Sequence, residues 1–122
     1  MKIVKVKNRL MYQGNDPHGT HYYAFFWNKK YKKYNAIQLT HTAKIDETRY
    51  KQVNEGKIKP IRLKKLDKYS DSGITKKKYI SDINGRPLNY NMGKIVINNV
   101  SGSSSKKIKK FGNVLFYKGK KY

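Results

Sequence analysis

The chain has no cysteine in its 122 residues and only 7 aspartate and glutamate residues. The absence of cysteine excludes disulfide bonds, thiolate zinc sites and cysteine nucleophiles. The acidic residues are scattered along the chain. Neither a paired-carboxylate acid/base mechanism nor a carboxylate-held magnesium site is therefore expected.

Long apolar runs are missing as well. No stretch approaches the roughly 20 apolar residues that cross a bilayer, and the first residues, MKIVKVKNRLMYQG, lack the apolar core of a signal peptide. We therefore expect a cytoplasmic protein without a membrane-spanning segment. The length predicts a single domain over residues 1–122.

Positive charge is what the chain has in excess. It carries 29 Lys+Arg and a formal net charge of +22, which disfavours the compact state unless a polyanion or salt screens it. Nucleic acid is the most obvious partner, ahead of an anionic membrane surface or an acidic protein. Arginine occurs only at positions 9, 49, 62 and 86. Because lysine acts as a point charge toward phosphate, we expect backbone binding more than base-edge recognition.

Two strands joined by a basic turn form the most apolar part of the sequence. Residues 20–27 are apolar on both faces, so this strand should be central and covered on both sides. Residues 34–41 place Ile37 and Leu39 on one face and Ala36, Gln38 and Thr40 on the other. For Trp27 and Tyr23, core packing is favoured over base stacking.

The remaining pattern predicts further short strands, loops and helices around this pair. We expect strands at residues 2–7 (at a sheet edge), 58–66, 79–83, 92–100 and 113–118, and loops at 8–20 and 67–78. Residues 46–55 predict a helix, and residues 101–112 a short capped helix or a mobile basic loop. The fold class is therefore mainly β (α+β), a small, strongly bent sheet or barrel with one or two short helices.

Few metal ligands remain once cysteine is excluded. His18 and His21 are three residues apart with Asp16 nearby, which is a weak zinc signal, so we expect neither a metal nor a cofactor. Metal-free phosphoryl transfer stays open, because RNA supplies its own 2′-OH nucleophile and the protein needs only a base, an acid and cations. DNA lacks this hydroxyl, so the same residues cleave RNA more easily.

Two stretches of the chain resemble a known family. Residues 19–26, GTHYYAFF, and residues 34–41, YNAIQLTH, resemble the second strand and the following strand of the MazF/PemK/Kid-like toxins of toxin–antitoxin systems, including relatives with RNA antitoxins. Residues 92–100 match a later barrel strand of that family. The resemblance covers about half of the chain. It implies an SH3-like/PemK-like β-barrel, usually dimeric, that cuts single-stranded RNA without metal.

The resemblance also assigns roles to individual residues. Thr40 matches the family's phosphate-contacting threonine, and His41 stands where serine is common. Lys44 lies near a lysine of the branch with RNA antitoxins. The family's Arg-Pro at the start of the second strand is replaced by Thr20-His21, so either His21 replaces the arginine as proton donor or the site is inactive. In an active site, His21 or His41 is expected to act as base or acid. The alternatives are structural: Thr40 as a β-former, and both histidines as solvated surface residues.

The leading hypothesis is a metal-independent endoribonuclease that leaves a 2′,3′-cyclic phosphate, with single-stranded RNA, an antitoxin of protein or RNA, and a second copy of the chain as partners. The expected catalytic residues are His21, Thr40, His41 and Lys44. The expected RNA-binding residues are basic: Lys29, Lys30, Lys32, Lys33, Arg49, Arg86, Lys106 and Lys107. The alternatives are a non-catalytic nucleic-acid-binding module and an inhibitor of a nucleic-acid enzyme.

Overall fold

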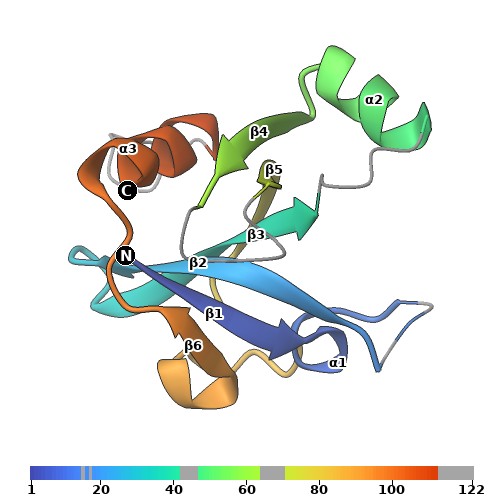
Figure 1. Ribbon diagram of the computed structural model, residues 1–122. Helices are drawn as coiled ribbons and strands as arrows, with labels where there is room; N and C mark the ends of the chain where they lie inside the picture. Colours follow the sequence, from blue (N-terminus) through green and yellow to red (C-terminus); the bar gives the residue numbers. More distant parts are fainter. Residues whose placement is uncertain (15, 17, 42–46, 64–70, 113–122) are drawn as a thin grey trace.

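The protein forms one six-stranded antiparallel sheet with short helices around it, in a computed structural model that describes residues 1–14, 16, 18–41, 47–63 and 71–112 (Figure 1). The strands are β1 (Lys2–Lys7), β2 (Thr20–Asn28), β3 (Lys33–His41), β4 (Ile58–Arg62), β5 (Asp71–Tyr79) and β6 (Lys94–Ile97). The helices are α1 (Asn8–Met11), α2 (Glu47–Asn54), the 3-10 helix η2 (Tyr90–Met92) and α3 (Gly102–Phe111).

The order of strands in the sheet is β4-β5-β3-β2-β1-β6. This arrangement confirms the prediction of a mainly β fold. Strands β4 and β6 are the two edges of the described sheet, so closure into a barrel stays a prediction. The two central strands, β2 and β3, are the pair that the sequence predicted from its most apolar stretch.

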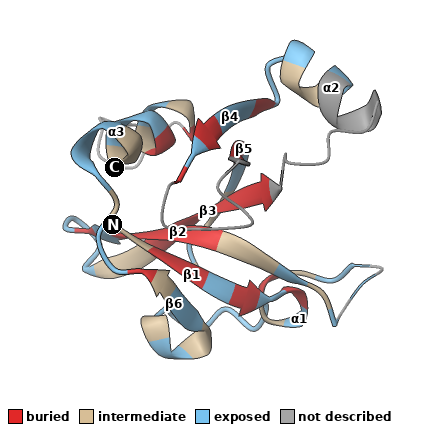
Figure 2. Cartoon of the chain, viewed as in Figure 1, coloured by how far each residue is buried: buried red, intermediate tan, exposed pale blue. Residues whose placement is uncertain are grey.

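The central strands bury both of their faces, as the sequence predicted for β2. Ala24 and Phe26 pack with Ile37 and Leu39 in one apolar cluster, which the fully buried Ile108 of α3 completes. Tyr23 and Phe25 pack on the opposite face, in a second cluster with Val4, Val6 and Leu88. Figure 2 shows the buried residues concentrated along β1, β2 and β3. Because successive side chains alternate between faces, one strand serves two cores.

Helices α2 and α3 both begin and end close to the predicted positions. The Ser101 hydroxyl accepts a hydrogen bond from the Ser104 amide at 3.3 Å, which is the expected N-cap of α3. Gly112 ends the helix and packs against Ile37 of the sheet below. After α2 the chain turns at Gly56, whose φ of +73° favours glycine.

The predicted edge position of the first strand is wrong. β1 lies between β2 and β6 and pairs with both. Lys5 and Lys7 reach solvent while Ile3, Val4 and Val6 are buried. Long lysine side chains can extend to water from an interior strand, so lysine content does not identify an edge here.

The segment that the sequence predicted as a polar loop, residues 67–78, is also different in the structure. All of its described part belongs to β5, an interior strand between β4 and β3. Its polar residues Ser72 and Thr75 are buried. The Thr75 hydroxyl donates a hydrogen bond of 2.7 Å to the Gln38 carbonyl, a contact between residues far apart in the chain. This pairing stabilises a strand that has little apolar pattern of its own.

Three smaller predictions also differ from the structure. The predicted strand at residues 79–83 is wrong, because β5 ends at Tyr79 and a turn around Asp82 follows. The Asp82 carboxylate accepts hydrogen bonds from the amides of Asn84 and Arg86, both at 2.8 Å. The predicted loop at residues 8–20 begins with the helical turn α1. The strand predicted at residues 113–118 lies outside the described residues.

Candidate functional site

An open pocket of about 390 Å³ lies beside the ends of β2 and β3 that are far from their connecting turn. This volume is within the range of ligand-binding pockets. Its lining comes from α1, β2, β3, α2, β4 and β5 and from the residues around them. The lining residues are Tyr12, His21, Gln38, Thr40, Gln52, Lys57, Ile58, Thr75, Lys76 and Lys77.

The register of the central strands brings His21 and Thr40 to the same pocket. Tyr23 of β2 pairs with Gln38 of β3, and His21 and Thr40 each stand two positions further toward the pocket. Residues two apart share a face of a strand, so both side chains are on the pocket side. Thr40 pairs on its other side with Gly73, which adds no side chain in front of the threonine. Two residues that the sequence predicted as catalytic are thus brought together.

Asn8 determines which nitrogen of His21 carries the proton. The Asn8 side-chain NH₂ donates to the carbonyl of Asp16 at 3.1 Å, so its amide oxygen faces the imidazole. That oxygen lies 2.6 Å from Nδ1 of His21 and can only accept, so Nδ1 is the protonated nitrogen. Nε2 is therefore the basic nitrogen of the neutral ring. Asn8 itself is buried, which fixes this orientation.

The loop before β2 is built to hold Asn8 in place. The Asn8 amide donates to the Gly19 carbonyl at 2.9 Å, and the Gly19 amide donates to the Asp16 carboxylate at 2.9 Å. A Cβ at Gly19 would collide with the side chains of both Asp16 and Asn8. Asp16, which the sequence offered as a weak metal ligand, instead orders the turn that supports His21.

Tyr12 adds a hydroxyl beside the imidazole. Its oxygen lies 3.4 Å from Nδ1 of His21, at the limit of a hydrogen bond. Burial raises the pKa of Tyr12, and the Asp16 carboxylate raises it further. The phenol therefore stays protonated at neutral pH and is available in the pocket wall as a hydrogen-bond donor.

A bulge in β5 shapes the far wall of the pocket. The β3–β5 register shifts between Ile37 and Leu39, so that residues 75–77 oppose Gln38 alone. The Thr75 hydroxyl holds this bulge, donating to the Gln38 carbonyl and accepting from the Lys77 amide at 3.1 Å. The Tyr79 hydroxyl donates to the Gln38 side-chain oxygen at 3.1 Å. Bulges re-aim side chains, and this one places Lys76 and Lys77 at the pocket.

The lining of the pocket contains three lysines, namely Lys57, Lys76 and Lys77, and no carboxylate. Lys57 makes an ion pair with Glu55 at 2.9 Å, outside this lining. The Lys76 ammonium lies 5.3 Å from the centre of the Phe111 ring. The Lys57 ammonium is thus paired with Glu55 and the Lys76 ammonium lies against Phe111, so Lys77 is the lysine of the lining with neither contact. A lining that combines lysines, an imidazole and a hydroxyl without a carboxylate suits a phosphate group.

Gln52 of α2 is a further residue of the pocket lining. Its side-chain oxygen is buried and makes no hydrogen bond among the described residues. An unsatisfied amide oxygen at a pocket wall is a ready acceptor for a ligand donor.

The other residues predicted for the site are elsewhere or undescribed. His41 pairs through its backbone with Ser72, but its side chain, like that of Arg49, lies outside the described part, as does all of Lys44. The remaining predicted RNA-binding residues do not line the pocket and are distributed over the β2–β3 turn, the Asp82 turn and α3: Lys29, Lys30, Lys32, Lys33, Arg86, Lys106 and Lys107.

Sequence reasoning missed several residues that make the site: Asn8, Tyr12, Gln52, Lys57, Lys76 and Lys77. Asn8 stands in a stretch that reads as a loop, and only its contact with His21 across the fold reveals its role. Lys76 and Lys77 were assigned to a polar loop because residues 67–78 include the polar run Ser70, Asp71, Ser72 and Gly73.

Comparison of the chain with family models, curated proteins and solved structures finds no match. Within the part of the chain that the structure describes, no group of three or more His, Asp or Glu side chains could hold a metal ion. In the same residues no helix has the length and apolarity to cross a membrane. The likeness to MazF/PemK/Kid-like toxins therefore stays a prediction from sequence.

Proposed function

We propose that the protein is a metal-independent endoribonuclease acting on single-stranded RNA, and that it is a relative of the MazF/PemK/Kid-like toxins. The observation that carries this proposal is that His21 and Thr40 line one pocket together with lysines and without a carboxylate. An imidazole, a hydroxyl and ammonium groups are sufficient for RNA cleavage through the 2′-OH.

In the proposed reaction the 2′-oxygen of RNA attacks the adjacent phosphorus. Nε2 of His21 accepts the 2′-OH proton, because Nδ1 already holds its proton toward Asn8. The bond from phosphorus to the 5′-oxygen breaks, and a lysine ammonium of the pocket gives that oxygen a proton. The products are a 2′,3′-cyclic phosphate and a 5′-hydroxyl. Acid–base catalysis of this kind contributes roughly 10²- to 10⁴-fold to the rate.

Thr40, Tyr12 and the lysines have separate tasks in this reaction. The Thr40 and Tyr12 hydroxyls donate hydrogen bonds to the phosphate oxygens, and Tyr12 can do so because its raised pKa keeps it protonated. Lys77 balances the negative charge that develops on the phosphorane.

The test is incubation of the purified protein with single-stranded RNA in excess EDTA, followed by mapping of the new ends. We expect 2′,3′-cyclic phosphates and 5′-hydroxyls, and no cleavage where one 2′-deoxynucleotide replaces the nucleotide that attacks. His21→Ala and Thr40→Ala should both be impaired, with Ile83→Ala, an exposed residue outside the pocket, as the control. Inert wild-type protein, or variants that cut like wild type, would refute the proposal.

The proposed partners follow from the same charge. An antitoxin of RNA would bind the lysine-rich surface as a polyanion, and a protein antitoxin would need an acidic segment for the same reason. A homodimer is the arrangement that the family resemblance implies. Size-exclusion chromatography with light scattering would test this by measuring the molar mass in solution.

A non-catalytic nucleic-acid-binding module is the second candidate, and the charge of +22 favours it independently of the pocket. It predicts affinity for RNA and DNA that falls steeply with salt, and no product ends in the EDTA assay.

A further inference from the structure

Aromatic side chains are exposed at the end of the β2–β3 hairpin that lies away from the pocket. Trp27, the only tryptophan, is 47% exposed, so the prediction that it packs in the core is wrong. Tyr23, the other residue considered for base stacking, is fully buried and cannot take that role. The exposed indole offers an aromatic surface that a partner can contact.

The exposed indole packs against a neighbouring ring. Its ring meets that of Tyr34 edge to face, with centroids 4.9 Å apart and planes at 73°. Tyr34 contacts Tyr90 in turn, with centroids 4.6 Å apart. Burial, with the hydrogen bond to Tyr34, raises the pKa of Tyr90 to about 12, so the phenol is neutral. We call Trp27, Tyr34 and Tyr90 the aromatic platform.

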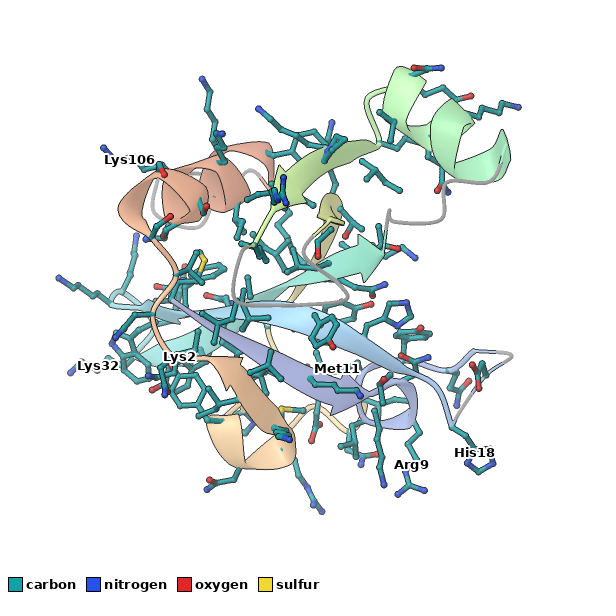
Figure 3. The ribbon with its side chains drawn as sticks, in the orientation of Figure 1. Lys2, Arg9, Met11, His18, Lys32 and Lys106 are labelled. Atoms are coloured by element: carbon teal, nitrogen blue, oxygen red, sulfur yellow. The ribbon has the colours of Figure 1, made fainter. Side chains whose placement is uncertain are left out.

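Lysines are frequent next to the platform. The β2–β3 turn and the first residue of β3 carry four, which we call the turn lysines: Lys29, Lys30, Lys32 and Lys33. The Lys2 ammonium lies 5.6 Å from the centre of the Tyr90 ring and hydrogen-bonds to Asn98 at 3.2 Å and 3.3 Å. Figure 3 shows Lys2 and Lys32 at one end of the molecule and Arg9 and His18 at the other.

The turn that presents these lysines has a defined shape. The buried Asn28 side chain accepts hydrogen bonds from the amides of Lys30 and Tyr31, at 3.0 Å and 3.2 Å. Lys32 adopts a positive φ of 51°, which completes the reversal. The backbone that carries the turn lysines is therefore ordered next to Trp27, and the Lys33 ammonium lies 5.7 Å from the centre of the Tyr31 ring.

We propose that the aromatic platform is a second nucleic-acid subsite, where a base of a single strand stacks on Trp27 and the turn lysines contact the adjoining phosphates. Rings interleaved with point charges are how proteins bind single strands without sequence preference. A duplex keeps its bases stacked inside, so it cannot use the indole. An apolar protein partner would not require the neighbouring lysines.

This subsite is separate from the cleavage pocket. His21 and Trp27 are six residues apart on β2, a separation of about 20 Å along an extended strand. Stacking on Trp27 needs no 2′-OH, so this subsite would bind a single strand even if the protein did not cleave RNA. A strand long enough to reach both places would be held at two points.

The test uses Trp27 as its own reporter, since no other tryptophan contributes fluorescence. The probes are a single-stranded oligodeoxynucleotide of about 12 nucleotides, an abasic strand of equal length and charge, and the matching duplex. We expect strong quenching of the indole by the first probe only. Quenching that is equal for the abasic strand or the duplex would overturn the proposal, because it would show a charge effect without stacking.

Affinity is then measured by anisotropy of the labelled single strand, in protein variants with checked folding. Trp27→Ala should weaken binding on the order of 5- to 150-fold, and Trp27→Phe should restore part of it. Ile80→Ala, which removes another exposed apolar side chain outside the platform, should bind like wild type. Unchanged affinity in Trp27→Ala refutes the subsite. Fluorescence that changes with protein concentration alone, or only with anionic vesicles, would reassign the surface to a second copy or a membrane.

Discussion

The two ends of the β2–β3 hairpin differ in how they present polar groups. At one end, His21 and Thr40 line a pocket whose parts are fixed by hydrogen bonds from α1 and the β5 bulge. At the other end, Trp27 and the turn lysines are exposed around an aromatic contact. Figure 1 shows α1, the start of β2 and the end of β3 on one side, and the β2–β3 turn on the other.

Both ends use the same face of the same two strands, so alternation alone does not separate their roles. The two ends differ in how many elements enclose the functional side chains. A pocket lined by residues from several elements can position an atom for chemistry. Exposed aromatic rings suit stacking with a base of any identity. We therefore expect changes at the first end to affect turnover and changes at the second to affect affinity.

The largest effect should come from His21→Gln, which removes the acid–base group. We expect kcat for RNA cleavage to fall by roughly 10²- to 10⁴-fold, with little change in affinity for a non-cleavable oligodeoxynucleotide. Trp27→Ala should instead raise KM while kcat changes little. Single-turnover cleavage and anisotropy measure the two quantities. A variant of Trp27 that loses kcat as severely as the His21 variant would remove the distinction between the two ends.

The next effect should come from Asn8, which acts through His21 and is a positioning residue. Asn8→Ala should lower kcat by roughly 10- to 100-fold, as expected for a residue that orients a functional imidazole. Asn8→Asp places a carboxylate beside the ring, which favours the protonated imidazole, so the acidic limb of the pH–rate profile should move up by about 1 to 2 pH units.

The shift in pH profile separates this role from simple structural support. A folded Asn8→Asp protein with the wild-type pH profile would show that His21 does not exchange the catalytic proton. Thr20→Ala, an exposed residue next to the histidine, is the control and should leave the profile in place.

Removing one lysine charge at either end of the hairpin should have a smaller effect, and the loss of binding should be similar at the two ends. Lys77→Gln and Lys32→Gly should each reduce the salt dependence of binding by about 0.7 in the log–log slope for a single strand. Glycine at position 32 suits the positive φ, so the turn is kept. Only Lys77→Gln should also lower kcat, because Lys77 lines the pocket. Equal losses of kcat in both variants would contradict the division.

The sequence predicted the parts of the fold whose pattern is local. β2 was predicted because its run is apolar on both faces, β3 because Ile37 and Leu39 share one face, and α3 because Ser101 and Gly112 mark its ends. His21 and Thr40 were predicted at the ends of those strands, and the structure places them in one pocket.

The rest depends on contacts between distant residues. β5 is polar and becomes a strand because Thr75 bonds to Gln38, which lies 37 positions earlier. The support of His21 by Asn8 joins a loop-like stretch to a strand start. β1 became an interior strand because β6 pairs with it from the far end of the chain. No local pattern of residues carries such information.

The smallest effects should be on stability, measured as the free energy of unfolding of one variant from each end of the hairpin. Asn28→Ala removes the acceptor for two turn amides and should lower the free energy of unfolding by about 1 to 2 kcal/mol. Thr75→Val removes the two hydrogen bonds that hold the β5 bulge and should cost a similar amount. Urea denaturation followed by circular dichroism measures both.

Thr75→Val should also slow cleavage, since it displaces Lys77, whereas Asn28→Ala should weaken only single-strand binding. If Asn28→Ala slowed single-turnover cleavage while single-strand binding stayed unchanged, the turn would affect the geometry of the pocket, and the proposed division between the two ends would be wrong.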